Sequence, residues 1–109
     1  MTVRYPRLLV SRNRIFENAA RVSERCARAG IALTGVTKGV CAREALVRAM
    51  AEGGCDELGD SRIDNLAAIR TMNVGLPLLL LRIPMPSEIA ATVRIADRSL
   101  VSMAQTISL

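Results

Sequence analysis

The sequence has 109 residues, half of them hydrophobic, and carries a formal net charge of +5 at pH 7. It contains no histidine, and its three cysteines form no CxxC pair, so the composition argues against a metal site and a disulfide framework and favours the cytoplasm. The arginines are scattered and almost no aromatic residues lie between them, so we expect neither a nucleic acid nor a membrane as partner.

The first half of the chain alternates between extended and helical patterns. A short apolar run at 7–10 favours a strand, and Ser11 is well placed to cap a helix that Gly30 would end. Residues 31–37 are rich in β-formers and nearly uncharged, as a buried strand requires. The pattern then predicts two further elements, a helix at about 42–52 and a strand at 55–59.

The second half continues the same alternation. Ser61 offers a cap for a helix at 62–72, and an apolar run at 78–82 predicts a fourth strand. After two prolines, Ser87 would cap another helix. The last predicted elements are a strand at 98–102 and a helix that begins beyond it and runs to Leu109.

Strands that alternate with helices at this spacing indicate βαβ units and a parallel sheet. Two architectures fit this order, a doubly wound sheet and a (β/α)₈ barrel, and neither a GxGxxG nor a Walker-type phosphate loop occurs. Because a barrel needs roughly 250 residues, we expect residues 1–109 to be an incomplete barrel domain. This part would hold about four to five strand–helix units and no second domain.

Lys38 is the most informative residue, because it is the only lysine in a chain that otherwise uses arginine for positive charge. It follows the strand predicted at 31–37, and parallel α/β folds place their reacting groups at the carboxyl ends of strands. Alternation along the strand puts Thr34, Val36 and Lys38 on one face. Schiff-base chemistry needs an amine that can lose its proton, which arginine does not provide. The alternative is an ordinary surface lysine at a strand end.

Several short segments follow one another along the chain: Tyr5-Pro6, Gly35–Cys41 (GVTKGVC), Asp60–Asn65 (DSRIDN), Leu80–Met85 (LLRIPM), and Ala96-Asp97 followed by Ser99-Leu100. In this order and at this spacing they resemble the alanine/ornithine racemase family, whose members are pyridoxal-phosphate (PLP) enzymes of fold type III. The resemblance covers nearly the whole chain.

The resemblance implies the N-terminal, TIM-like barrel domain of a PLP-dependent amino-acid racemase. In this family the lysine, here Lys38, holds PLP as an internal aldimine and acts as acid or base at the substrate α-carbon. A tyrosine from a C-terminal domain acts from the opposite side in alanine racemases. Those enzymes also carry an aromatic residue a few positions after the lysine, where this chain has Ala42 and Arg43, so the ornithine-type branch fits better. We expect the 109 residues alone to be inactive.

Arg82 is the second candidate for the site. It closes the apolar strand predicted at 78–82, and a guanidinium at that position would bind the substrate carboxylate or an oxygen of the cofactor. The alternative is an arginine that pairs with a neighbouring acid such as Glu88.

Asp60 and Arg62 lie where a strand passes into a helix. Asp60 would orient Arg62 or Arg82 by pairing with its guanidinium, and the alternative is that Asp60 or Ser61 is a helix cap. Cys41 has no histidine to act as its base, so we expect it to be structural.

Other functions stay open at this stage. A non-catalytic PLP-binding homeostasis protein would share the barrel and the lysine, and a basic α/β binding module or a Schiff-base aldolase would also fit. Because an unfinished barrel exposes sheet edges and helix faces, we expect a homo-oligomer.

Overall fold

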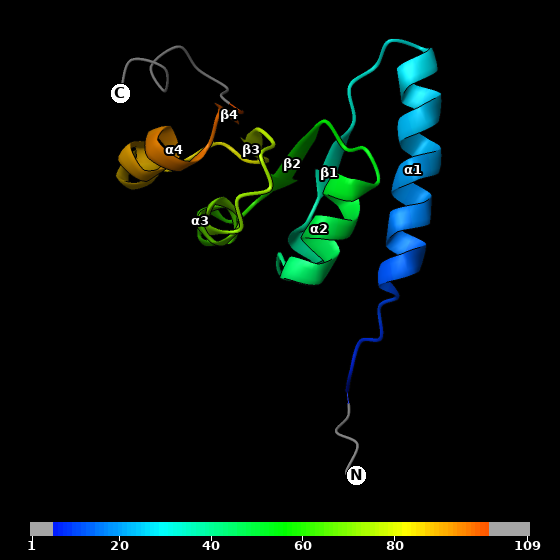
Figure 1. Cartoon of the computed structure of the whole chain (residues 1–109). Coiled ribbons are helices and arrows are strands. Elements are labelled where there is room, and N and C mark those ends of the chain that lie inside the picture. The colour runs from blue at the N-terminus through cyan, green and yellow to red at the C-terminus, as the bar shows by residue number, and fades with distance from the viewer. Residues whose placement is uncertain (1–5, 101–109) are drawn as a thin grey trace.

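The computed structural model describes residues 6–100 and consists of helices that alternate with short strands (Figure 1). Every element predicted after Ser11 that lies in this range is present, usually with shorter bounds. The strand predicted at 98–102 is present as Arg98–Ser99, while its last two residues and the predicted helix that runs to Leu109 lie outside the described residues. In chain order the elements are α1 (Arg12–Arg28), β1 (Thr34–Val36), the 3₁₀ turn η1 (Lys38–Val40), α2 (Glu44–Glu52), β2 (Glu57–Asp60), α3 (Ile63–Thr71), β3 (Leu78–Leu80), the 3₁₀ turn η2 (Pro86–Glu88), α4 (Ile89–Ile95) and β4 (Arg98–Ser99).

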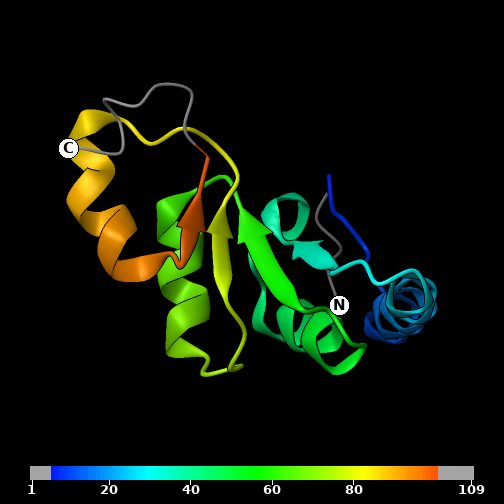
Figure 2. The same ribbon diagram turned by 90° about the horizontal axis from the view of Figure 1, so that it is seen from above.

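The four strands form one sheet in the order β1-β2-β3-β4, and all three pairings are parallel (Figure 2). A doubly wound sheet reverses its strand order at a switch point, whereas a barrel adds each new strand beside the previous one. The sequential order therefore identifies the barrel-type winding. The sequence alone fitted both this winding and the doubly wound one.

The helices bury one face of the sheet. The strand register places Gly35, Leu58 and Leu78 side by side, and the two leucines are almost completely buried. On the other face, Val36 and Leu79 flank Gly59, and Val36 is 41% exposed. This second face, which would line the interior of a barrel, is open in the described part of the chain. The core cluster beneath the helices comprises Ala42, Val47, Leu58, Leu66, Ile69, Leu78 and Leu80.

Helix α1 packs against α2 at two glycines that end α2. A Cβ added at Gly53 would lie 2.6 Å from the Cβ of Ala19, so only glycine allows this approach. Gly54, whose φ of +109° also favours glycine, accepts a hydrogen bond at its carbonyl from the Ser23 hydroxyl at 2.9 Å. No helix in residues 6–100 is long and apolar enough to cross a lipid bilayer.

One of the three predicted serine caps is confirmed. The Ser11 hydroxyl accepts a hydrogen bond from the backbone N–H of Arg14 at the start of α1. The caps predicted at Ser61 and Ser87 are wrong, because neither α3 nor α4 begins with a side-chain cap. Ser87 lies inside η2, and at the start of α3 the Asp60 carboxylate accepts the backbone hydrogen bond instead.

The strand predicted at 7–10 is also wrong. Residues 6–10 have no regular secondary structure, and Leu8 and Leu9 are 73% and 76% exposed. A strand needs a neighbour for its backbone groups, and the described sheet, made of β1 to β4, offers this segment none.

Candidate active site

Lys38 lies immediately beyond the carboxyl end of β1. The last ladder hydrogen bond of the strand runs from the Thr37 N–H to the Gly59 carbonyl at 2.9 Å. Lys38 then begins η1, so the expected strand alternation stops one residue before it. Its side chain is exposed, and within residues 6–100 no hydrogen bond or ion pair holds its ammonium group.

A tight turn follows Lys38. Cys41 and Ala42 both have a φ of +52°, a left-handed conformation that residues with a Cβ rarely adopt. The turn is closed by hydrogen bonds from the N–H groups of Val40 and Ala42 to the Thr37 carbonyl, both at 3.2 Å. Cys41 is exposed and Ala42 is buried in the core, so Cys41 belongs to the turn that returns the chain to α2.

Asp60 ends β2 and is completely buried. Its carboxylate accepts hydrogen bonds from the Thr37 hydroxyl at 2.7 Å, the Arg62 N–H at 2.9 Å and the Asn65 amide at 3.1 Å. The predicted pairing with the guanidinium of Arg62 or Arg82 is therefore wrong. Alternation along β2 directs Asp60 to the helix-covered face with Leu58, where unpaired N–H groups at the start of α3 are its partners.

Arg82 joins the loops that follow β2 and β3. Its Nε donates to the Ser61 carbonyl at 2.7 Å, and its two terminal nitrogens contact the Glu88 carboxylate at 2.7 and 2.8 Å. The hydrogen bond from Arg82 lowers the pKa of Glu88 below its ordinary range. Of the two alternatives for Arg82, the pair with Glu88 is thus present, and a direct contact with a ligand stays a prediction.

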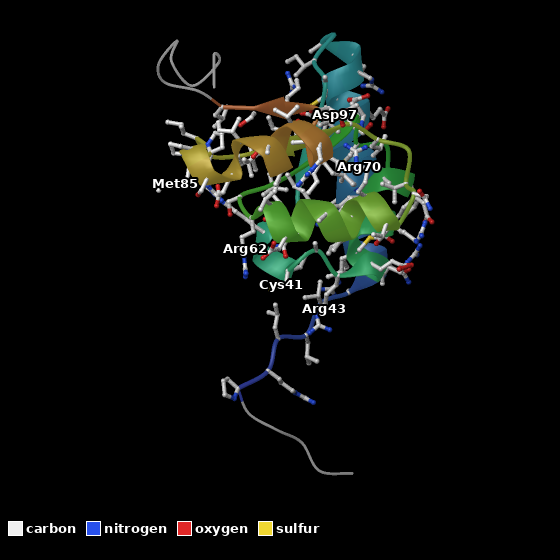
Figure 3. The ribbon with its side chains drawn as sticks, turned by 90° about the vertical axis from the view of Figure 1, so that its left-hand side faces the viewer. Cys41, Arg43, Arg62, Arg70, Met85 and Asp97 are labelled. Carbon is white, nitrogen blue, oxygen red and sulfur yellow. The ribbon has the colours of Figure 1, made fainter. Side chains whose placement is uncertain are left out.

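Arg62 differs from Arg82 in that its side chain is exposed and has no ion pair among residues 6–100. Figure 3 shows Arg62 and Met85 toward one end of the molecule, where the strands end, and Arg70 and Asp97 toward the other. The structure therefore brings the loops with Lys38, Arg62 and Arg82 to the same end of the sheet.

Two curated relatives match this chain in sequence. It is 38% identical to a lysine racemase from Thermotoga maritima over 98 residues, which are 90% of this chain and 28% of the relative. It is 31% identical to an ornithine racemase from Acetoanaerobium sticklandii over 103 residues, which are 94% of this chain and 29% of the relative. No family model matches the chain.

Solved structures of alanine racemases match the fold. The enzyme from E. faecalis gives a TM-score of 0.74 at 20% identity, over 91% of this chain and 27% of the other. The enzyme from Corynebacterium glutamicum gives 0.68 at 17% identity, over 88% and 30%. The chain is thus similar in sequence to a lysine and an ornithine racemase and similar in fold to alanine racemases. It spans less than a third of the length of the curated relatives it matches.

The similarity to the alanine racemase fold agrees with the winding of the sheet, since the described strands follow the order of a barrel. Two residues that support the site, Thr37 and Asn65, were not predicted from the sequence, and both bind Asp60. Both lie inside the motifs that resemble the racemase family. The sequence therefore pointed to these positions, but it could not show that their side chains bind Asp60.

A second group missed by the sequence reasoning lies on the open face of the sheet. The Arg98 guanidinium donates two hydrogen bonds to Glu57, at 2.8 and 2.6 Å, and Thr34 donates to the same carboxylate at 2.8 Å. These contacts join β1, β2 and β4 near their amino ends. The hydrogen bonds from Arg98, and then that from Thr34, lower the pKa of Glu57 although its burial opposes this.

Stability should fall in acid because of three carboxyl groups whose pKa the fold lowers: Glu57, Glu88 and Asp97, the last through the Leu78 N–H and then Arg70. Their stabilisation is complete above the ordinary carboxyl pKa and is lost as pH falls through the lower folded values, between about pH 5 and pH 3. Urea unfolding at several pH values should show this loss, and Glu57→Gln should make it shallower.

Glu17→Gln is the control for this measurement, because it removes the same charge from an exposed position of α1. Equal acid sensitivity in Glu57→Gln and Glu17→Gln would show that the contacts of Glu57 do not contribute.

Proposed function

We propose that this chain is the lysine-bearing part of a PLP-dependent amino-acid racemase and that Lys38 is its catalytic residue. The observation that carries the proposal is the place of Lys38, the only lysine, exposed without a partner in residues 6–100 at the carboxyl end of β1. Reacting groups of barrel enzymes lie at this end of the strands. The similarity to a lysine and an ornithine racemase supports the same function.

The residues present fit PLP at its point of attachment. The cofactor binds covalently through an aldehyde, which requires an amine that is not engaged elsewhere, and Lys38 meets this requirement in the described part of the chain. When bound, PLP supplies a ring that accepts electron density from the α-carbon of an amino acid. Lys38 would hold the cofactor and, once its amine is free, take the proton from the α-carbon or return it.

The other candidates have different proposed roles. Arg62 is exposed at the same end of the sheet, and its fork of donors suits a carboxylate or phosphate. Arg82 is already bound to Glu88 and to the Ser61 carbonyl, so it is proposed to shape the loops beside the cofactor and to contact the cofactor from this fixed position. Asp60 is proposed to orient the Lys38 segment, since it binds Thr37.

The proposed substrates are α-amino acids with a second amino group, because the curated relatives carry the names lysine racemase and ornithine racemase. The proposed compartment is the cytoplasm, in keeping with the three free cysteines.

The test is an absorbance titration of the chain with PLP, followed by borohydride reduction and peptide mapping. We expect a near-visible band for lysine-bound PLP and a reduced adduct at Lys38 that exceeds the background at the N-terminal amine. The sequence contains no tryptophan and only one tyrosine, so protein absorbance adds little to the spectrum. No adduct at Lys38, in this chain or in a longer chain that includes it, would rule out the proposal.

Catalysis is tested separately from binding. A racemase removes the α-proton, so an α-deuterated lysine or ornithine should lose its label in water in the presence of a longer, PLP-loaded chain. A non-catalytic PLP carrier would bind the cofactor and leave the label in place.

The proposed partner is a second copy of the chain. The outer edges of β1 and β4 have no paired strand in the described sheet, and Val36 and Leu100 are 41% and 47% exposed on or beside its open face. Unpaired edges and exposed apolar faces favour association. Size-exclusion chromatography with light scattering should give a mass above 11.8 kDa that rises with protein concentration. A constant monomer mass across concentrations would contradict this.

A further inference from the structure

The segment that carries Lys38 has few contacts of its own. Residues 38, 39 and 41 are exposed and Val40 is half-buried. A Cβ added at Gly39 would meet nothing within 4 Å, so the space around the turn is open. The two flanking residues, Thr37 and Ala42, are buried with 0% and 4% exposure. The position of the Lys38 backbone therefore depends on how these two residues are held.

Thr37 is fixed by hydrogen bonds at its N–H, its carbonyl and its hydroxyl. Its N–H donates to the Gly59 carbonyl at 2.9 Å, which continues the ladder between β1 and β2. Its carbonyl accepts the N–H groups of Val40 and Ala42, which closes the turn around Lys38. Its hydroxyl donates to the Asp60 carboxylate at 2.7 Å. The first two contacts use backbone atoms, which any residue at this position would supply. Only the hydrogen bond from the hydroxyl to Asp60 depends on the threonine side chain.

Asp60 is a rigid acceptor for this hydroxyl. It is completely buried, and its oxygens are also bound by the Arg62 N–H and by the Asn65 amide, both at the start of α3. A buried polar group with every partner in place adopts one geometry, because leaving a partner unpaired is costly. The hydroxyl of Thr37 therefore ties the end of β1 to the first turn of α3.

We infer that Thr37 and Asp60 are positioning residues for Lys38, and that the hydrogen bond between them fixes the turn from which the amine projects. The inference rests on the proposed function only in taking Lys38 as the reacting group. Reacting groups must be held to within about 0.5 Å of the productive geometry by residues that are themselves locked.

The chain contains a closely matched control. The Thr34 hydroxyl donates to the Glu57 carboxylate at 2.8 Å. This bond has the same chemistry as the one between Thr37 and Asp60, and it also joins β1 to β2, but at the amino end of the strands. Thr34→Val and Thr37→Val therefore each remove one threonine–carboxylate bond between these strands, and only the second is next to Lys38.

The first test uses amide hydrogen exchange in the chain without PLP. Exchange at Val40 and Ala42 is normalised to that at Leu58, whose N–H donates to the Pro77 carbonyl within the sheet, to correct for global unfolding. In Thr37→Val, exchange at these two amides should be about tenfold faster than in wild type, the effect expected for one lost hydrogen bond. Thr37→Ser should restore protection and Thr34→Val should leave it unchanged. Equal protection in Thr37→Val and Thr34→Val would overturn the inference.

The second test measures how fast PLP is fixed on Lys38 by borohydride. Thr37→Val should slow fixation, and Thr37→Ser should return it toward the wild-type rate. If the wild type fixes no PLP, the proposed function fails, while hydrogen exchange still decides whether Thr37 and Asp60 position the turn.

If Thr37→Val does not fold, Asp60→Asn replaces it, because it keeps the shape and one acceptor oxygen. It should weaken protection at Val40 and Ala42 in the same direction, and unchanged protection would contradict the inference.

Discussion

Replacing Lys38 by arginine is expected to abolish covalent attachment of PLP while leaving the fold intact. The side chain is exposed and makes no hydrogen bond or ion pair within residues 6–100, so its replacement removes no polar contact that holds the structure together. Arginine keeps the positive charge but does not lose its proton, so it cannot attack an aldehyde. The adduct found by mass spectrometry after borohydride reduction should fall to background. The free energy of unfolding should change by no more than about 0.5 kcal/mol.

A double variant separates a specific site from general reactivity. Lys38→Arg combined with Arg43→Lys keeps one lysine and the same net charge, and moves the amine to an exposed position just before α2. We expect the relocated lysine to be modified no faster than the N-terminal amine. If it were modified as fast as Lys38 in the wild type, the place of Lys38 at the end of β1 would have no importance.

Replacing Leu58 by alanine is expected to destabilise the chain by about 3 kcal/mol. Leu58 lies at the middle of the central strand β2, is completely buried, and belongs to the core cluster beneath α2 and α3. Its substitution removes apolar contacts and leaves a cavity, and a parallel sheet of short strands has little freedom to collapse around it. Urea denaturation gives the free energy directly, because a two-state transition of a small domain yields both midpoint and slope.

Leu9→Ala is the matched control for Leu58→Ala. Leu9 is 76% exposed in the segment before α1, so the same chemical change should alter the free energy of unfolding by less than about 0.5 kcal/mol. A similar loss in both variants would mean that the core is not centred on β2 as described.

The sequence predicted the elements well where the signal is local. The cap at Ser11 and the end of α1 before Gly30, whose φ is +69°, were both correct, because a helix terminus depends on residues within one turn. The strand expected at 7–10 failed for the opposite reason. An apolar run becomes a strand only when another strand accepts its backbone hydrogen bonds, and this segment has no such neighbour in the described sheet.

In the candidate site, too, local features could be predicted from the sequence and contacts between distant residues could not. Lys38 could be selected from the sequence because it is the only lysine and follows a predicted strand. The partner of Asp60 could not be selected, because the hydroxyl that binds it comes from Thr37, 23 residues earlier in the chain. Likewise, the pairing of Glu57 with Arg98 joins strands whose adjacency depends on the winding of the whole sheet.

By itself, the sequence determined the order of helices and strands, the resemblance to the alanine racemase family and the single lysine just beyond a strand. The burial expected for that strand was wrong, because its residues Thr34–Val36 are half-buried or exposed. Only the tertiary structure decided that the strands follow one another across the sheet, and that Arg82 is bound to Glu88. It also decided that Asp60 holds Thr37 instead of a guanidinium. The physical reason is that hydrophobic periodicity and capping act over a few residues, whereas strand order and buried hydrogen bonds depend on which distant segments meet.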